Sequence, residues 1–511
     1  MGRFDCGIVG IDLGTTNTAI AYYDEILKKG VCCSNGEGSL VTASAVTFLP
    51  RDDVLVGNTA RNNAIISPEI TATLFKRQMG VKNKVMQVGD NIYSPQQLSA
   101  FVLRNVVEDA EEELEKKITD VVITVPAYFG VNRRKATIEA GEIAGLNVMG
   151  ILDEPSAVVY YTDSFKSLDG KTCLVFDLGG GTLDIVVARV TESSINEIVI
   201  DGDLSLGGSD WDVELLKYIR EKCLSGNHLD KDIEQELMIK TEMAKKHLSE
   251  KIETQFGVST REGRINVTLT RQEFDKCTRH LREEVRNVLC RVQRKMKEKN
   301  VDKLDMIILS GGATRMPQIR ELLEEMFPGK RISARDVDCA VANGAAIYAK
   351  LLRTKEKIRT SCQVDCPNIK KLNNITGRSY GIVVYSYETR GKEIRNIIFQ
   401  NSELPVVNER IFKTKIKNQK EARLEIFEND EDSDKVNLLN AVKIGECILN
   451  INGNLPKGSP IHVLFKLDEN GLLYVNGYEQ SGETEIETWI QTEGILMENV
   501  FRLTENEMPI S

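Results

Sequence analysis

Apolar and polar positions follow different periods in the two parts of the chain. Up to about residue 350, short β-prone runs alternate with segments whose apolar residues lie three and four positions apart, which predicts an α/β fold. Ser94-Pro95 supplies the N-cap and first-turn residues of one predicted helix. A long helix is predicted at 272–298. The basic residues at its end are interpreted as a solvated face: Arg291, Arg294, Lys295 and Lys297.

From residue 355 the helical period is lost. The stretch 355–378 is polar and without a strong period, so it is interpreted as a linker. Short alternating runs then predict antiparallel strands, and Asn470-Gly471 between two of them predicts a hairpin. We therefore expect an α/β domain at 1–354, a linker at 355–378 and an all-β domain at 379–511. No helical domain is expected to follow, because the sequence stops at Ser511.

Composition excludes several classes of protein. The 66 Lys and Arg residues are outnumbered by 76 Asp and Glu, and the formal charge of −10 argues against nucleic-acid binding. The N-terminus has no hydrophobic signal core and no stretch is predicted to span a membrane, so a cytoplasmic location is expected. Eleven scattered cysteines fit a reducing compartment. Cys362 and Cys366 are interpreted as an incidental pair rather than a metal site.

Two glycine-rich runs carry the chemistry. Asp12-Leu13-Gly14-Thr15-Thr16-Asn17-Thr18 and Asp177-Leu178-Gly179-Gly180-Gly181-Thr182-Leu183-Asp184 each follow an apolar strand. Glycine lets backbone N–H groups approach a phosphate, and the hydroxyls add donors. The leading carboxylate of each run would repel a phosphate, so a hydrated magnesium ion is expected between them. Two such runs predict two related lobes that hold one polyphosphate, as in an ATP-driven machine.

Further motifs occur in a fixed order along the same part of the chain. They are Leu74-Phe75-Lys76-Arg77-Gln78-Met79-Gly80, Val125-Pro126-Ala127-Tyr128-Phe129, Asp153-Glu154-Pro155-Ser156-Ala157, Gly207-Gly208-Ser209-Asp210, the segment Glu242 to Ser249, and Leu309 to Pro317. Together they closely resemble the DnaK-type chaperones, the seventy-kilodalton heat-shock protein family. The resemblance runs from about residue 7 to 350 and more loosely from 379 to 480. The sequence Lys76-Arg77-Gln78-Met79-Gly80 is most similar to the HscC-type bacterial branch.

The resemblance implies a fold and a function. The fold is an actin-like, duplicated (RNase H-like) α/β nucleotide-binding domain followed by an all-β sandwich that binds peptides. The function is that of an ATP-dependent chaperone that hydrolyses ATP slowly and binds extended apolar segments of unfolded clients. A J-domain protein and a nucleotide exchange factor are candidate partners, with no nucleic acid and no membrane. ATP or ADP and Mg²⁺ are the implied cofactors, and K⁺ is a further candidate.

It also implies residue roles. The catalytic set is Lys76, Glu154, Thr182, Asp177 and Asp12, of which Asp12 and Asp177 hold Mg²⁺ through waters. The nucleotide-binding set is Gly14, Thr15, Thr16, Asn17, Gly179, Gly180, Gly181, Gly207, Gly208, Glu242, Lys245, Lys246, Ser249, Gly311, Gly312, Arg315 and Asp338. Lys246 stands where the family usually has arginine beside the adenine, so weaker nucleotide binding is expected. Pro126, Arg134 and Glu154 resemble the relay that reports the nucleotide state to the second domain.

The chain departs from the family pattern in ways that bear on mechanism. The interdomain run of leucines is replaced by the polar 358–366, which leaves little apolar area for docking. Gly150 replaces an arginine and Asp153 an asparagine at the J-domain contact. Without a lid, bound peptide should leave quickly. Two alternatives therefore stay open: an ATP-binding regulator without a coupled peptide cycle, and, ranked last, a sugar or acetate kinase.

Overall fold

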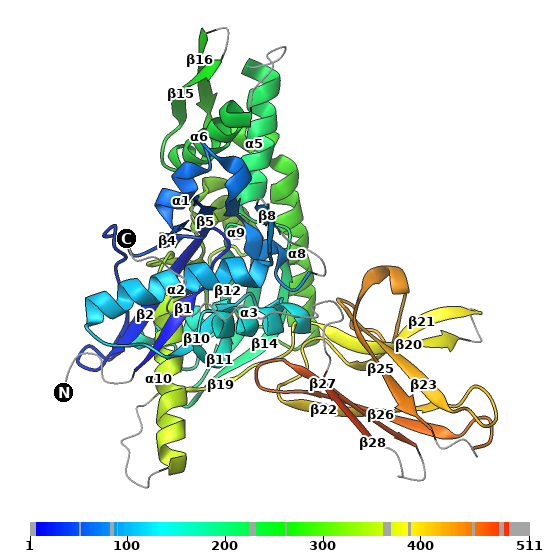
Figure 1. Cartoon of the computed structure of the whole chain (residues 1–511). Helices are drawn as coiled ribbons and strands as arrows, with labels where there is room; N and C mark the ends of the chain where they lie inside the picture. Colours follow the sequence, from blue (N-terminus) through cyan, green and yellow to red (C-terminus); the bar gives the residue numbers. More distant parts are fainter. Residues whose placement is uncertain are drawn as a thin grey trace.

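The computed structural model describes residues 7–50, 53–81, 86–88, 90–223, 231–260, 263–360, 369–386, 390–451, 455–479 and 485–489. Two α/β lobes form the larger body, and an all-β domain docks against its side (Figure 1). Cys362 and Cys366 lie outside the described residues. Within the described part of the chain, no helix is both long and apolar enough to cross a membrane.

The first lobe, lobe I, is built on a mixed sheet. Its strands are β1 (Ile8–Asp12), β2 (Asn17–Asp24), β3 (Lys29–Cys32), β10 (Asp120–Val125) and β11 (Asn147–Asp153), in the order β11-β10-β1-β2-β3, with β4 (Thr42–Ala43) paired to β2. Helices α2 (Pro95–Leu114) and α3 (Val131–Ile143) pack on one face. The predicted start of α2 is confirmed, because Ser94 and Gln97 form a reciprocal capping box.

Lobe II repeats this arrangement. Strands β12 (Thr172–Leu178), β13 (Leu183–Val190), β14 (Ser194–Asp203), β17 (Met306–Ser310) and β18 (Arg331–Ala334) run in the order β18-β17-β12-β13-β14. In both sheets the first strand lies between an antiparallel and a parallel neighbour: β1 pairs with β2 and β10, and β12 pairs with β13 and β17. Helices α4 (Glu154–Phe165) and α10 (Ala340–Thr360) share one apolar core with both sheets. The lobes therefore meet through a common helical layer.

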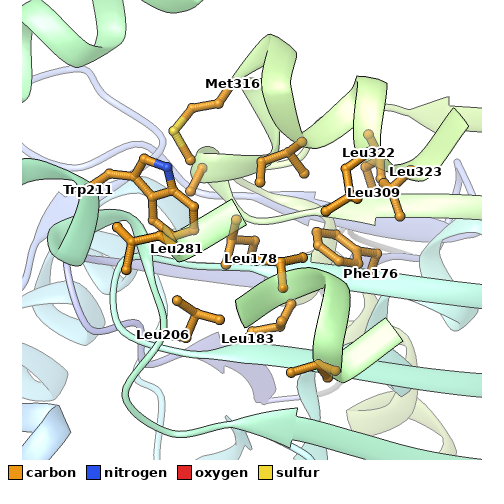
Figure 2. Close-up of a cluster of buried hydrophobic side chains, with 14 of the residues drawn as sticks. Phe176, Leu178, Leu183, Leu206, Trp211, Leu281, Leu309, Met316, Leu322 and Leu323 are labelled. Carbon is orange, nitrogen blue, oxygen red and sulfur yellow. The ribbon is translucent and has the colours of Figure 1, made fainter. Parts of the chain in front are cut away.

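The outer face of the lobe II sheet holds the largest apolar cluster. Figure 2 shows Phe176, Leu178 and Leu183 of the sheet facing Trp211 and Leu281 from the covering helices. Those helices are α5 (Gly208–Cys223), α6 (Lys231–Glu250), α7 (Arg271–Cys277), α8 (Arg279–Glu298) and α9 (Pro317–Met326). Because this core directly underlies the loop after Leu178, it fixes one of the two glycine-rich runs.

Small elements extend both lobes beside the cleft. In lobe I they are β5 (Ala45–Phe48), β6 (Val54–Val56), α1 (Asn58–Asn63), the 3₁₀ turn η1 (Pro68–Ile70), β7 (Thr71–Thr73), the 3₁₀ turn η2 (Phe75–Gln78), β8 (Met86–Val88) and β9 (Asn91–Tyr93). In lobe II they are the hairpin β15 (Glu253–Thr260) and β16 (Gly263–Thr270) and the 3₁₀ turn η3 (Gly312–Arg315).

The C-terminal part forms two antiparallel sheets around one core. One sheet has β20 (Ser379–Ser386), β21 (Gly391–Ile398), β23 (Glu421–Asn429), β24 (Lys435–Val436) and β25 (Ala441–Asn450), with the turn η4 (Leu438–Asn440) between the last two. The other has β22 (Val406–Lys413), β26 (Pro460–Leu467), β27 (Leu473–Glu479) and β28 (Glu485–Trp489). The hairpin predicted at Asn470-Gly471 is confirmed: it joins β26 to β27, with Gly471 at φ 72°.

The segment predicted as a polar linker, 355–378, includes regular secondary structure among its described residues, 355–360 and 369–378. Helix α10 continues to Thr360, and β19 (Lys371–Asn373) pairs in parallel with β14 at the edge of the lobe II sheet. The side chains of Ile369, Leu372 and Ile375 pack on the core shared by the lobes. Apolar residues after 368 therefore dock on this core, whereas most of 358–366 lies outside the described residues, so the expectation for that stretch stays a prediction.

The long helix predicted at 272–298 is two helices. Thr278 separates α7 from α8, and its hydroxyl bonds to the carbonyl of Phe274 at 2.8 Å. The solvated-face interpretation was wrong for two of the four basic residues. Arg291 and Lys295 form ion pairs of 2.7 and 2.8 Å with Asp201, a fully buried aspartate of β14. Burial of that carboxylate requires such partners.

Candidate functional site

The two glycine-rich runs face each other across the cleft between the lobes. Asp12 ends β1 and Asp177 lies near the end of β12, so equivalent strand ends bring the carboxylates together. A cavity of about 90 Å³ lies between them. Its walls include Asp12, Gly14, Thr15, Thr16, Asn17, Lys76, Glu154, Asp177, Gly179, Gly180, Thr182, Gly311, Gly312 and Asp338. These predicted site residues thus lie around one small polar space.

Lys76 enters this space from lobe I. It lies in η2, which follows Leu74 in the left-handed region at φ 56°. Its ammonium lies 2.8 Å from a carboxylate oxygen of Glu154, the first residue of α4, and the lysine is only 3% exposed. A buried ammonium held by one carboxylate is a fixed positive charge, suited to a phosphate but not to a mobile surface contact.

The cavity has more carboxylates than cations. Burial and the charge of Glu154 raise the pKa of Asp12 to about 7. Burial, and then Glu154, also raise the pKa of Asp184 to about 7 and that of Asp177 well above its usual range. A divalent cation would relieve this excess of negative charge, and carboxylate oxygen is the donor that Mg²⁺ prefers. Among the described residues, no group of three His, Cys, Asp or Glu side chains is placed to hold a metal ion directly.

A larger cavity of about 880 Å³ continues from the small one toward α6. Glu242, Lys245, Lys246 and Ser249 line it from α6, and Arg315 and Asp338 line it from the opposite side. Lys245 donates to the Gly208 carbonyl and to Asp212, both at 2.7 Å. Lys246, by contrast, is 59% exposed and pairs with Glu242 at 2.7 Å. The residues predicted to bind the nucleoside therefore line one cavity.

Two of the predicted glycines support the site from behind. Gly181 and Gly207 line neither cavity; they contact each other, and a Cβ on Gly207 would lie 2.5 Å from the Gly181 backbone. Gly311 has φ 80°, and a Cβ there would lie 2.4 Å from the carbonyl oxygen of Leu178. These glycines let three loops approach one another closely.

Ion pairs that join the two lobes across the cleft were missed by sequence reasoning. Arg61 of α1 pairs with Glu242 of α6, and Arg77 of η2 pairs with Asp210 of α5. Although burial alone would raise the pKa of Glu242, Arg61 and then Lys246 lower it to about 2. Arg77 directly follows Lys76 and Asp210 directly follows Gly207-Gly208-Ser209, so proximity to known motifs was the available signal.

Of the three predicted relay residues, Arg134 lies where the β-domain docks, while Glu154 lines the small cavity. Arg134 of α3 donates to Asp153 at 2.7 Å and to the Asn470 carbonyl of the β26–β27 hairpin at 3.4 Å. The Ile151 N–H donates to the Asn470 side chain at 3.3 Å, beside Gly150. Arg134 thus joins Asp153, the neighbour of Glu154, to the β-domain, and its role as a relay stays a prediction.

A second docking contact lies at the start of α3. Its N-cap residue is Gly130, which has no side chain to cap the helix. The Glu428 carboxylate of β23 occupies that place, and a Cβ on Gly130 would lie 1.9 Å from its Oε2 atom. Burial raises the pKa of Glu428, and the charges of Arg378 and Arg133 oppose that rise. The β-domain therefore places a carboxylate at a helix N-terminus, where negative charge is favourable.

The family follows from comparisons with known proteins. The family model described as Hsp70 protein matches residues 8–508. The chaperone protein DnaK of Thermosipho melanesiensis is 35% identical over 483 residues, which cover 92% of this chain and 77% of that protein. The DnaK proteins of Thermosipho africanus and Thermotoga maritima are each 34% identical and cover 93% of this chain and 79% of their own lengths. The chain belongs to the Hsp70 family.

Family membership confirms the resemblance to DnaK-type chaperones drawn from the motifs. The HscC-type branch stays a prediction, and so do the individual residue roles and the domain boundaries. The alternative of a regulator without a coupled peptide cycle rested on the altered linker and on Gly150. It is not favoured, because the Hsp70 family model and the DnaK relatives support an ATP-dependent chaperone.

Proposed function

We propose that this Hsp70-family chaperone hydrolyses ATP slowly in the cleft between its lobes and uses the nucleotide state to control client binding by its β-domain. The observation that carries the proposal is the buried Lys76–Glu154 pair, which lies in the polar cavity that also receives Asp12, Asp177 and Thr182. The repeated strand order supports an actin-like nucleotide-binding domain. The common core of the C-terminal sheets supports a β-sandwich client domain.

Phosphoryl transfer depends on positioning and charge neutralisation more than on a strong base, and the cavity residues provide both. Lys76 would neutralise charge on the γ-phosphate and orient the attacking water, while Glu154 fixes the lysine. Backbone N–H groups of the two glycine-rich runs, with the hydroxyls of Thr15 and Thr182, would hold the phosphates. Mg²⁺ bound through waters to Asp12 and Asp177 would supply further charge neutralisation.

Coupling between the domains would follow from the docked arrangement. Asn470 contacts Arg134 and Ile151, and Glu428 lies at the start of α3, so a shift of lobe I changes the surface that the β-domain meets. Clients would be extended apolar segments. A cytoplasmic location, a J-domain partner, an exchange factor and K⁺ remain predictions.

Steady-state ATP hydrolysis by the full chain tests the proposal. We expect slow hydrolysis that an apolar-rich unfolded peptide stimulates, and Lys76→Met should abolish it while leaving ATP binding measurable. Lys117→Met is the matched control, since Lys117 is exposed, pairs with Glu111 near the end of α2 and lines neither cavity. Hydrolysis that survives Lys76→Met would disprove the catalytic site, and hydrolysis that ignores peptide would disprove the coupling.

A further inference from the structure

Glu197 is a buried carboxylate of β14 that lines neither cavity of the cleft. It is 5% exposed, pairs with Ala188 and lies on the same face of the strand as Ile195, which belongs to the apolar core shared by the lobes. Burying a carboxylate on the apolar face of a strand costs free energy unless it is hydrogen-bonded, so its hydrogen-bond partners indicate why it is there. Its two oxygens reach two different parts of the molecule.

The first partner belongs to the nucleotide site. Oε1 of Glu197 is hydrogen-bonded to the hydroxyl of Ser156, which itself is fully buried. Ser156 is the third residue of α4, the helix that begins with Glu154. Because Glu154 holds Lys76, any change at the phosphate cavity that moves the start of α4 also moves Ser156.

The second partner belongs to the segment between the domains. Oε2 of Glu197 accepts a hydrogen bond of 3.0 Å from the backbone N–H of Ile375. This bond continues the β14–β19 pairing, which ends at Asn196 and Asn373. The segment 374–376 in turn exchanges backbone hydrogen bonds of 2.8 to 2.9 Å with residues 401–404 of the β-domain. Ile375 is thus fixed to the β-domain as well as to Glu197.

The protonation state decides how both bonds form. Burial, and then the charge of Asp153, raise the pKa of Glu197 to about 8, against the opposing effects of Ser156, Ile375 and Arg134. As the bonds stand, Oε1 accepts from the Ser156 hydroxyl and Oε2 from the Ile375 N–H. In the neutral form the carboxyl O–H can instead donate to the Ser156 oxygen while the C=O accepts from Ile375. A glutamine amide can make the same two bonds, whereas leucine fills a similar volume and makes neither.

We propose that Glu197 is a positioning residue that couples helix α4 to the interdomain segment 371–376, so that the nucleotide state sets whether this segment stays docked on lobe II. The inference rests on the proposed function and names the contact that carries its coupling. Neither oxygen alone suffices, because one bond reports the position of α4 and the other holds Ile375.

Tryptic cleavage of the full chain after Lys370 and Lys371 tests the coupling. These residues lie in and beside β19, which must leave the sheet before the protease can bind it. We expect cleavage about fivefold or more faster with ADP than with ATP. Ser156→Ala and Glu197→Leu should each bring that ratio to about one, whereas Glu197→Gln should keep it. The matched control is Glu192→Gln, an exposed acid in the turn before β14.

Ser156→Ala distinguishes coupling from simple support, since Ser156 does not contact the segment. If Ser156→Ala and Glu197→Leu keep the wild-type ratio, the inference is wrong. Circular dichroism and ATP affinity of each variant check that it is folded. The proposed function is judged separately by Lys76-dependent, peptide-stimulated hydrolysis of the wild type, so either idea can fail without the other. A wild-type ratio of one would overturn the inference even where hydrolysis persists.

Discussion

Arg77 and Asp210 form a two-pronged ion pair across the nucleotide cleft, with Nη1–Oδ1 and Nη2–Oδ2 distances of 3.1 and 2.5 Å. Nη2 of Arg77 also donates to the carbonyl of Gly181 at 3.1 Å. A planar guanidinium that meets a carboxylate through two parallel bonds resists displacement better than a single contact. One lobe I side chain, next to Lys76, thereby holds the phosphate loop of lobe II.

Arg77→Met should speed nucleotide release, because opening the cleft no longer breaks this pair. The pair is about three-quarters buried, so we expect release about three- to tenfold faster, with a smaller effect at high salt. Stopped-flow displacement of a fluorescent ATP analogue measures the rate. Lys117→Met, which removes an exposed pair elsewhere in lobe I, should leave it unchanged. An unchanged release rate in Arg77→Met would show that other contacts keep the cleft closed.

The phosphate cavity could be predicted because its determinants are local. A β-strand followed by a glycine turn places Asp12 or Asp177 at a strand end whatever surrounds it, and the order of the motifs identified the rest. The hairpin at Asn470-Gly471 was equally local. The same reasoning misjudged Arg291 and Lys295, because their partner Asp201 is 90 and 94 positions away, respectively, on a different element.

The strand in the interdomain segment was missed for a related reason. Leu372 and Ile375 are separated by polar residues and form no apolar run, yet β14 provides an open sheet edge that any short strand can extend. Glu197 did carry a signal, since it follows Ile195 by two positions in an otherwise apolar strand and shares its buried face. Only the folded chain shows that its carboxyl group is hydrogen-bonded to Ser156 and Ile375.

Gly130→Ala should weaken docking of the β-domain. The new Cβ would lie 1.9 Å from Oε2 of Glu428, so that side chain must leave its place beside Arg133 and Arg378. Each domain should stay folded, because only the end of a flexible side chain is displaced. With ATP bound, we expect small-angle X-ray scattering to give a larger radius of gyration than in the wild type.

Two further variants test that explanation. Gly36→Ala is the matched control, since its Cβ would meet only a carboxylate oxygen of Asp109 at an ordinary 3.5 Å. Adding Glu428→Asp to Gly130→Ala shortens the acid and should restore part of the docking. A Gly130→Ala variant as compact as the wild type would mean that Glu428 is not a docking contact.

Lys246→Arg should strengthen nucleotide binding. Lys246 is more than half exposed and tethered only by the 2.7 Å pair with Glu242 at the mouth of the larger cavity. A guanidinium can keep that pair and stack on an adenine ring, which an ammonium does less well. We expect the affinity for ADP, measured by calorimetry, to rise about two- to fivefold. Arg320→Lys, an exposed exchange on α9 that also keeps the charge, is the control and should leave the affinity unchanged. An affinity of Lys246→Arg no higher than that of the wild type would contradict the expected stacking.

Docking of the β-domain should weaken as the pH rises through the range in which Glu197 titrates. In the docked state burial raises the Glu197 pKa to about 8, and undocking of the segment removes part of that burial, which lowers the pKa. The docked state therefore binds the proton more tightly, and docking loses this contribution as the pH rises through about 8. Asp153 and Glu428, whose pKa values are also raised, act in the same direction, and Arg134 opposes them. Scattering with ATP from pH 6 to 9 should therefore show a growing radius of gyration. Glu197→Gln, which keeps both hydrogen bonds but cannot ionise, should flatten that growth; a profile as steep as the wild type would assign the pH dependence to Asp153 or Glu428 instead.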